Sequence, residues 1–441
     1  MFATRTDWSL TPNRLSKMVD ERQRKGLPII DLTESNPTRC GFTVDAQAVL
    51  AALANSRSLT YEPDPRGLLC ARQAVTGYYA ERGIRVDPEQ IFLTASTSEA
   101  YSYAFRLLAN PGDNILAPRP SYPLLDFLTR LNDLELVSYP LAYDHRWQID
   151  LTALAACLNQ RSKAVLVVHP NNPTGSFVRC EELKFLISCC QTQPLAIIAD
   201  EVFADYAFED VAPGFSPAQG GPPHLALPRL RDRHPLPQGG EGIVQSGTGQ
   251  YTSATPKSRD TNADRVRSLA AESGALTFTL SGLSKISALP QMKLAWVIVN
   301  GPEDLLRAAL ARLEVIADTY LSVSAPLAGA TPELLELRHQ VQPQILGRVR
   351  QNLYWLDEQL SRGVAISRLQ TEGGWYVILR MPAVRSDEDW AMEWLREEGV
   401  LVHPGHFYDF SCESHLVVSL LPFTEVFREG MLKILARTAK L

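Results

Sequence analysis

Short apolar runs alternate with helical windows between residues 88 and 300. Four of these runs lack any alternation of polar and apolar residues, and they span residues 91–94, 164–168, 195–199 and 275–279. Strands that are buried on both faces have this pattern, because neither face meets water. Strands that alternate with helices predict an α/β domain, in which helices sandwich a mostly parallel sheet.

The hydrophobic pattern also predicts several helices and a second unit. Asp45 is the expected N-cap of a helix over 45–60, and another helix over 67–83 ends at a glycine. Beyond residue 300, we expect helices over 303–320, 332–362 and 386–398, and short strands over 375–380 and 415–420. This mixture predicts a smaller α+β unit.

One segment interrupts the pattern. Residues 213–265 contain the stretches PAQGGPP and PLPQGGEG and a tract of Ser, Thr and Gly. A segment of this length and composition is uncommon inside a compact domain, so it indicates a surface insertion or a disordered loop. A binding loop or lid is the alternative interpretation.

Composition and charge exclude some classes of protein. The chain has 441 residues, and 43 basic minus 49 acidic residues give a net charge of −6, which argues against a nucleic-acid binder. No apolar run approaches the roughly 20 residues of a membrane helix, and the basic stretch 1–26 does not look like a secretory signal. Seven cysteines without metal-type spacing predict reduced thiols, a cytoplasmic location and no metal site.

Two segments that follow predicted strands offer polar groups to a ligand. Residues 94–100 place hydroxyls and amides where a helix begins, which suits a phosphate, although Ser and Thr at such a position are more often an ordinary N-cap. Residues 169–175, His-Pro-Asn-Asn-Pro-Thr-Gly, lie at the carboxyl end of a strand, where open α/β sheets bind ligands. A plain turn is the alternative there.

Two further segments carry charged groups at strand ends. Asp200, before Glu201, could hold a proton on a ring nitrogen or could simply cap the next helix. Lys285, after Ser284, could form a Schiff base or could be a solvated surface group.

Taken together and in order, the motifs resemble those of a known family. They are Asn36-Pro37-Thr38, the stretch from Tyr61 to Gly67, Asn172-Pro173-Thr174-Gly175, Asp200-Glu201, and Ser284-Lys285 with Pro290 beyond. The sequence resembles fold-type I pyridoxal-phosphate enzymes, in particular the class I/II aminotransferases. The resemblance implies an N-terminal arm and small-domain segment over 1–44, a large cofactor-binding domain over 45–309, and a small C-terminal domain over 310–441. The small domain would thus be built from both chain ends.

The resemblance assigns roles to individual residues. Lys285 would hold the cofactor as a Schiff base and then shuttle a proton between the substrate Cα and the cofactor. Asp200 would pair with the pyridinium nitrogen, Asn172 would bind the ring oxygen, and Tyr122 would stack on the ring. The remaining cofactor contacts would be phosphate ligands, namely Ser96, Thr97, Ser98 and Ser284. Tyr61 would reach the phosphate of a neighbouring subunit, which implies a homodimer with a shared active site.

Three positions depart from the family pattern. Lys293 stands where the family usually has an arginine on the phosphate. Phe203 stands where the family usually has a tyrosine that donates a hydrogen bond to the ring oxygen, so this bond would be missing unless Tyr206 supplies it. Val417 replaces the arginine that clamps the substrate carboxylate. Another cation would then bind this carboxylate, either Arg39, which with Asn36 is our candidate substrate contact, or Arg380; otherwise the substrate is not an ordinary α-amino acid.

The sequence therefore predicts a cytoplasmic aminotransferase that uses pyridoxal 5′-phosphate. It would move an amino group between an amino acid and a 2-oxo acid, with no nucleic-acid or membrane partner. A carbon–sulfur β-lyase with the same cofactor is the first alternative. A non-catalytic cofactor-binding protein, either a regulator or an inactive scaffold, is the second.

Overall fold

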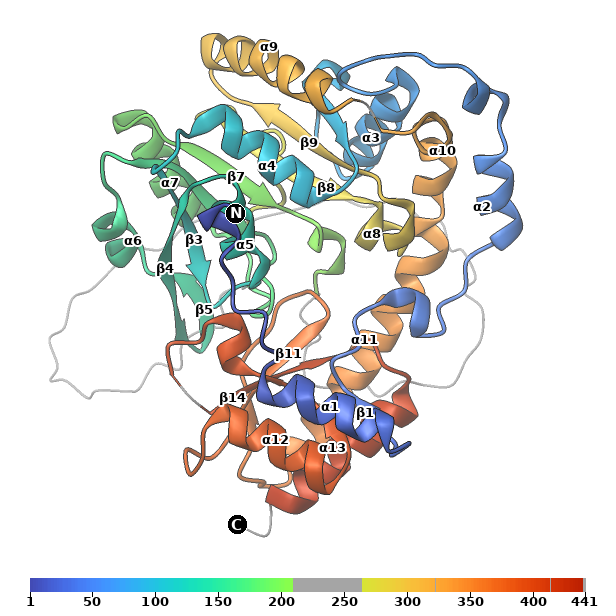
Figure 1. Ribbon diagram of the computed structural model, residues 1–441, viewed down its shortest axis with the longest axis vertical. Helices are drawn as coiled ribbons and strands as arrows, with labels where there is room; N and C mark the ends of the chain where they lie inside the picture. Colours follow the sequence, from blue (N-terminus) through green and yellow to red (C-terminus); the bar gives the residue numbers. More distant parts are fainter. Residues whose placement is uncertain (209–263, 322, 413, 439–441) are drawn as a thin grey trace, which may run out of the picture. The chain divides into compact units, whose positions relative to one another are not determined.

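An eight-stranded sheet organises most of the chain in the computed structural model (Figure 1). The strand order is β2-β9-β8-β7-β6-β3-β4-β5. The strands are β2 (Ile91–Thr94), β3 (Asn114–Arg119), β4 (Glu135–Asp144), β5 (Arg146–Ile149), β6 (Ser162–Val168), β7 (Ala196–Asp200), β8 (Thr277–Gly282) and β9 (Ala295–Asn300). The five strands from β8 to β4 are parallel, whereas β9 and β5 run antiparallel to their neighbours. The predicted mostly parallel sheet is confirmed.

The structure describes residues 1–208, 264–321, 323–412 and 414–438. Nearly all of the expected insertion 213–265 lies outside these residues. The described residues belong to one compact unit of the chain.

Both faces of the central strands are buried, as their apolar runs predict. In β6, Leu166 packs into a cluster on one face, while Val165 and Val167 pack into a cluster on the other. The first cluster is covered by α4 (Thr97–Leu108), α5 (Leu124–Leu131) and α9 (Glu303–Tyr320), and the second by α6 (Leu151–Cys157) and α7 (Cys180–Thr192). Helices therefore sandwich the sheet.

A third apolar cluster lies beside β2 and β9. It joins these strands to α2 (Ala46–Leu53), α3 (Leu69–Glu81), α8 (Leu283–Ile286) and α10 (Ala325–Glu336). Asp45 caps α2, since its side chain accepts a hydrogen bond from the amide of Ala48, as expected from sequence. This cluster supports α8, the short helix that carries Lys285.

The smaller unit is built from both chain ends, which confirms the predicted architecture (Figure 1). The N-terminal β1 (Ile30–Asp31) pairs with β12 (Val400–Leu401), and α1 (Arg14–Arg24) packs on α12 (Asp387–Glu397). The antiparallel sheet and remaining helices are β10 (Ser367–Arg368), β11 (Tyr376–Arg380), β14 (His415–Ser419), β13 (His403–Pro404), α11 (Arg338–Leu360) and α13 (Thr424–Thr438). The domain limits at 44/45 and 309/310 remain predictions.

The helical stretch expected over 332–362 is divided differently in the structure. One helix, α10, begins earlier, at Ala325, and a second, α11, starts at Arg338. At this junction the buried Arg338 forms ion pairs with Glu81 of α3 and with Glu336. The junction thus contacts α3, a helix that is distant in sequence, and the local pattern does not contain this contact.

Candidate functional site

A cavity of about 360 Å³ opens at the carboxyl ends of three parallel strands. Val168, Asp200 and Gly282 end β6, β7 and β8, and all three line the cavity. Ser35 and Tyr376, from the smaller unit, also line it. Ligands of open α/β sheets bind at this edge, so the cavity lies where the fold places chemistry.

Most of the predicted site residues meet in this cavity. Those that line it are Lys285, Asp200, Asn172, Tyr122, Thr97, Ser98, Ser284 and Lys293. They lie at or after the carboxyl ends of five strands of the large sheet, β2, β3, β6, β7 and β8. Phe203, one of the three departures, lines the cavity as well.

Lys285 extends into the cavity from α8 beside two aromatic rings. Its Nζ lies 4.7 Å from the centre of the Trp375 ring and 5.3 Å from that of Phe203. Burial among these groups lowers the pKa of Lys285 to about 8, although the attraction of Asp200 opposes this shift. About a tenth of such amines are neutral at pH 7, compared with well under a thousandth for a free lysine. The side chain is therefore suited to nucleophilic attack and proton transfer.

Asp200 presents a carboxylate whose orientation is fixed. Its Oδ2 accepts a hydrogen bond of 2.8 Å from the Tyr101 hydroxyl, and its Oδ1 accepts one of 3.1 Å from the Val202 amide. Removal from water raises the pKa of Asp200, while these hydrogen bonds and the charge of Lys285 lower it. A carboxylate held in this way can accept a hydrogen bond from a protonated ring nitrogen.

The start of α4 and the segment after β8 form a wall of the cavity that suits an anion. The Ser96 hydroxyl accepts from the Glu99 amide, so the first-turn amides of Thr97 and Ser98 have no acceptor within the helix. The positive helix terminus, the hydroxyl of Ser284 and the ammonium of Lys293 suit a phosphate group.

Two buried polar atoms in this region have no hydrogen-bond partner among the described residues. They are the amide oxygen of Asn172 and the hydroxyl of Ser281. Unpaired buried polar atoms are costly, and Asn172 lines the cavity, so a ligand that brings a polar group there would satisfy its oxygen. The residues therefore fit a small aromatic cofactor that carries a phosphate and ring substituents.

Four predicted site residues lie outside the cavity. The Ser96 side chain caps α4 instead of lining the cavity, and Asn36 accepts hydrogen bonds from the amide and hydroxyl of Thr38. Arg39 is exposed, with its guanidinium 3.9 Å from the Glu34 carboxylate. Tyr61 is 75% exposed. Neither Arg39 nor Asn36 lines the cavity, and their contact with a substrate stays a prediction.

The structure also shows the contacts of Tyr206 and Arg380, the two residues that could have replaced the missing tyrosine and the missing arginine. The Tyr206 hydroxyl donates to the backbone carbonyl of Lys285 at 2.7 Å, so it is not available to a cofactor oxygen in place of Phe203. Arg380 lies at the end of β11 with its guanidinium over the Tyr143 ring, and it does not line the cavity. Val417 is fully buried opposite Ile378. Among the described residues that line the cavity, the only cations are therefore Lys285 and Lys293.

Sequence reasoning missed several residues that line or enclose the cavity, four of them polar or aromatic. These four are Ser35, Tyr101, Trp375 and Tyr376. Tyr101 follows Thr97 by four residues on a predicted helix, so the two share a face, and this spacing was a usable signal. No sequence signal indicated Trp375 or Tyr376, because their contact with Lys285 and the cavity depends on packing between the two sheets.

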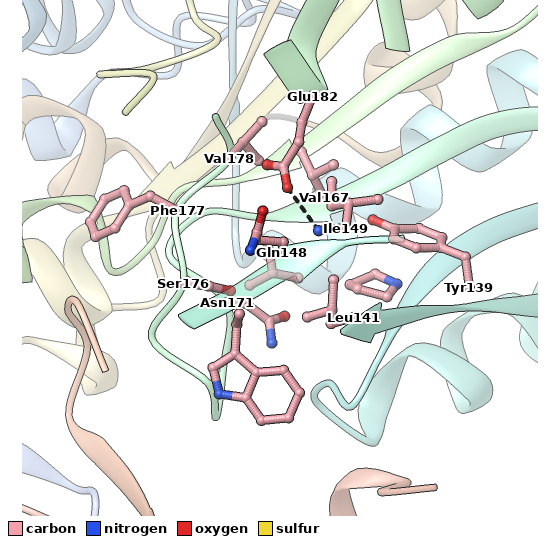
Figure 2. A pocket seen from close by; sticks show the side chains of 13 residues that line it. Tyr139, Leu141, Gln148, Ile149, Val167, Asn171, Ser176, Phe177, Val178 and Glu182 are labelled. Atoms are coloured by element: carbon pink, nitrogen blue, oxygen red, sulfur yellow. Dashed lines mark hydrogen bonds between the residues drawn. The ribbon is translucent and has the colours of Figure 1, made fainter. Parts of the chain in front are cut away.

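A second, much smaller cavity of about 20 Å³ is lined by side chains of β4 and β5, by Asn171 and by residues 176–178 (Figure 2). Its volume is close to that of one water molecule. Glu182 accepts a hydrogen bond from the amide of Ile149 here (Figure 2). Its other carboxylate oxygen accepts one from the amide of Arg179. The carboxylate is therefore occupied in joining β5 to α7, and the cavity belongs to the packing of the sheet.

Two observations bear on the expected absence of metal and membrane partners. Glu81, Glu336 and His339 form an exposed group, and Arg338 already pairs with both carboxylates. The absence of a metal stays a prediction. In the part of the chain that the structure describes, no helix has the length and apolar character needed to span a bilayer.

A family profile and curated relatives match most of the chain. The profile described as aminotransferase class I and II matches residues 28–422. The glutamate-pyruvate aminotransferase AlaA of Haemophilus influenzae is 24% identical over 419 residues, which cover 93% of this chain and 91% of the relative. The alanine aminotransferase of Mycobacterium bovis is 24% identical over 415 residues, which cover 91% and 83% of the two chains.

Solved structures share the fold. An alanine aminotransferase from Pyrococcus furiosus superposes with a TM-score of 0.78 at 19% identity, over 100% of both chains. An aspartate aminotransferase from Thermotoga maritima gives a TM-score of 0.75 at 18% identity, over 99% of each chain. The predicted architecture is confirmed by these neighbours.

Proposed function

The chain belongs to the class I and II aminotransferase family, and from this premise we propose that its Lys285 holds pyridoxal 5′-phosphate in the cavity. The protein is an enzyme, an aminotransferase, which argues against the regulator and scaffold alternatives. We infer that it moves an amino group between an amino acid and a 2-oxo acid.

One observation supports the proposal above all others. Lys285, Asp200 and Asn172 are far apart in sequence, yet they line one cavity at the carboxyl edge of the parallel sheet. Each has a common alternative role in isolation, as a surface lysine, a helix cap or a turn residue. Their convergence beside a wall that suits an anion is what favours cofactor chemistry.

The cofactor, when bound, supplies an aldehyde carbon that amines attack and a ring that withdraws electron density from the substrate Cα. The chain's own groups do the rest. With a pKa of about 8, Lys285 Nζ is neutral often enough to take a proton from the substrate and return it at another carbon. The carboxylate of Asp200 would hold the ring nitrogen in its protonated form, and the amide of Asn172 would orient the ring.

The far wall of the cavity anchors the phosphate. The amides of Thr97 and Ser98, the Ser284 hydroxyl and the Lys293 ammonium supply neutral and charged donors. Lysine gives a point charge but not the two-pronged contact of arginine, so Lys293 fixes the phosphate less rigidly than an arginine would. Tyr122 lines the cavity where it can stack on the ring, and Ser96 contributes by capping α4.

Reduction with borohydride tests the proposal directly. Purified protein with added pyridoxal 5′-phosphate should be coloured, and reduction should fix the cofactor to the peptide that contains Lys285. The Lys285→Ala variant serves as the matched control and should carry no fixed cofactor. A colourless wild-type protein without such a peptide would refute the proposal.

A donor panel then separates transfer from elimination. Amino acids assayed with pyruvate or 2-oxoglutarate as acceptor should yield the corresponding amino products. Release of pyruvate and ammonia without any acceptor would instead support the carbon–sulfur β-lyase. The identity of the carboxylate-binding group forms part of this question, since Arg39 and Asn36 lie outside the cavity.

We also propose that the enzyme is a homodimer in the cytoplasm. Tyr61 is exposed and lies away from the cavity of its own chain, as expected of a residue that serves a neighbour's phosphate. All seven cysteines are free thiols, which suits a reducing compartment. Mixing a Tyr61→Ala variant with a Lys285→Ala variant should restore activity in hybrid dimers, because one of the two sites then has both residues. A monomeric protein, or mixtures without recovery, would contradict the shared site.

A further inference from the structure

Tyr101 is a buried residue of the cavity to which the chemistry above assigns no role. It lies on α4, its side chain is only 4% exposed, and its ring packs 5.9 Å from that of Phe105. Its hydroxyl donates a 2.8 Å hydrogen bond to Oδ2 of Asp200. No other hydrogen bond of this hydroxyl is seen among the described residues.

The proton of this hydrogen bond stays on the phenol. Burial and the neighbouring carboxylate both raise the pKa of Tyr101 well above its ordinary value of 10. The Tyr101 phenol therefore keeps its proton at neutral pH and donates it to Oδ2 of Asp200. A charge-assisted bond of this kind favours the ionised form of the carboxyl group over the neutral form.

The two hydrogen bonds to Asp200 reach different oxygens. The Val202 amide binds Oδ1 at 3.1 Å, and the Tyr101 hydroxyl binds Oδ2. Contacts at both oxygens prevent the carboxylate from rotating about its terminal torsion, which is otherwise soft. Each oxygen keeps further acceptor capacity for a ligand in the cavity that Asp200 lines.

We propose that Tyr101 is a positioning residue, which holds the Asp200 carboxylate ionised and oriented toward the ring nitrogen of the cofactor. The inference rests on the proposed function, because it requires that Asp200 pairs with this nitrogen. It goes further in assigning a task to one hydroxyl group. A phenylalanine would fill the same space beside Phe105, so only the hydroxyl distinguishes the two residues at this position.

The test compares two ligands that differ at a single atom. The first is pyridoxal 5′-phosphate, and the second is its deaza analogue, in which a C–H group replaces the ring nitrogen. The Tyr101→Phe variant should bind the natural cofactor about tenfold or more weakly, since a hydrogen bond to a charged group is lost. Its affinity for the deaza analogue should stay within about twofold of wild type, because no N–H faces Asp200 in that complex.

Tyr103→Phe is the matched control. Tyr103 lies on the same helix, is 2% exposed, and directs its hydroxyl toward Glu99 rather than Asp200. Removing that hydroxyl deletes the same atom from the same helix, and it should leave the ratio of the two affinities unchanged. A general loosening of α4 would instead affect both variants alike.

A second variant guards against misfolding. Tyr101→para-aminophenylalanine keeps a ring donor at the same reach, so it should retain the wild-type preference for the natural cofactor. Melting temperatures of the cofactor-free proteins show whether each variant folds. Equal losses for both ligands in Tyr101→Phe, or no loss with either, would overturn the inference, as would a para-amino variant that behaves like the phenylalanine variant. Failure of the proposed function would give a different result from failure of the Tyr101 inference, because the wild-type protein itself would then bind neither compound.

Discussion

Replacing Lys285 by methionine should stabilise the cofactor-free protein. The folded structure holds the pKa of Lys285 at about 8, compared with an ordinary value of 10.5, so the difference is 2.5 units. Each unit corresponds to about 1.4 kcal/mol, which means that burying the charged amine costs about 3 kcal/mol below pH 8. The attraction of Asp200 is already contained in this pKa. Methionine fills a similar volume between Trp375 and Phe203 and carries no charge.

The stability advantage of the Lys285→Met variant should decrease as the pH rises. Between pH 8 and 10.5 the unfolded chain binds a proton at Lys285 that the folded chain does not, so wild-type stability rises with pH in this window. The advantage of the Lys285→Met variant should therefore shrink from about 3 kcal/mol near pH 7 to about 1.5 kcal/mol near pH 9.5. Denaturant unfolding of both cofactor-free proteins at the two pH values measures this gap.

A surface lysine provides the control. Lys17 is exposed on α1, and the Lys17→Met change should alter the free energy of unfolding by no more than about 0.5 kcal/mol at either pH. A Lys285→Met protein that is no more stable than wild type would refute the reasoning. A gain that does not change with pH would refute it as well, since it would come from packing rather than from charge.

Three further outcomes follow from the site and its surroundings. Phe203→Tyr should add a donor near the cofactor oxygen and shift the titration of the coloured Lys285 adduct to lower pH; an unchanged midpoint would show that the ring does not reach that oxygen. Burial raises the pKa of Glu201 to about 7, so wild-type stability should fall as pH rises from about 4.5 to 7, and the difference in melting temperature between wild type and Glu201→Gln should change across that window. A constant difference would argue that Glu201 stays ionised. Arg39→Ala should leave the KM for amino donors within about twofold, because the exposed guanidinium faces Glu34, and a large rise would instead identify Arg39 as the carboxylate clamp.

The sequence determined the architecture because the signals for it are local. Apolar runs without alternation identified strands β6 and β7 as buried on both faces, and their residues do divide between two apolar clusters. Asp45 was recognisable as a helix cap from its position alone, and its side chain makes the expected bond. The motifs around Asn172, Asp200 and Lys285 likewise sit at strand ends, and parallel strands bring their carboxyl ends to one edge.

Only the tertiary structure decided which groups surround those motifs. Trp375 and Tyr376 come from the smaller unit and meet the cavity because two sheets pack together, an arrangement that no window of sequence contains. The bond between Tyr101 and Asp200 joins residues 99 positions apart, and the pKa of Lys285 follows from burial by such distant neighbours. The local hydrophobic pattern reflects which side of a segment is exposed to water. The contacts that shift the pKa of a charged group, by contrast, involve segments that only folding brings together.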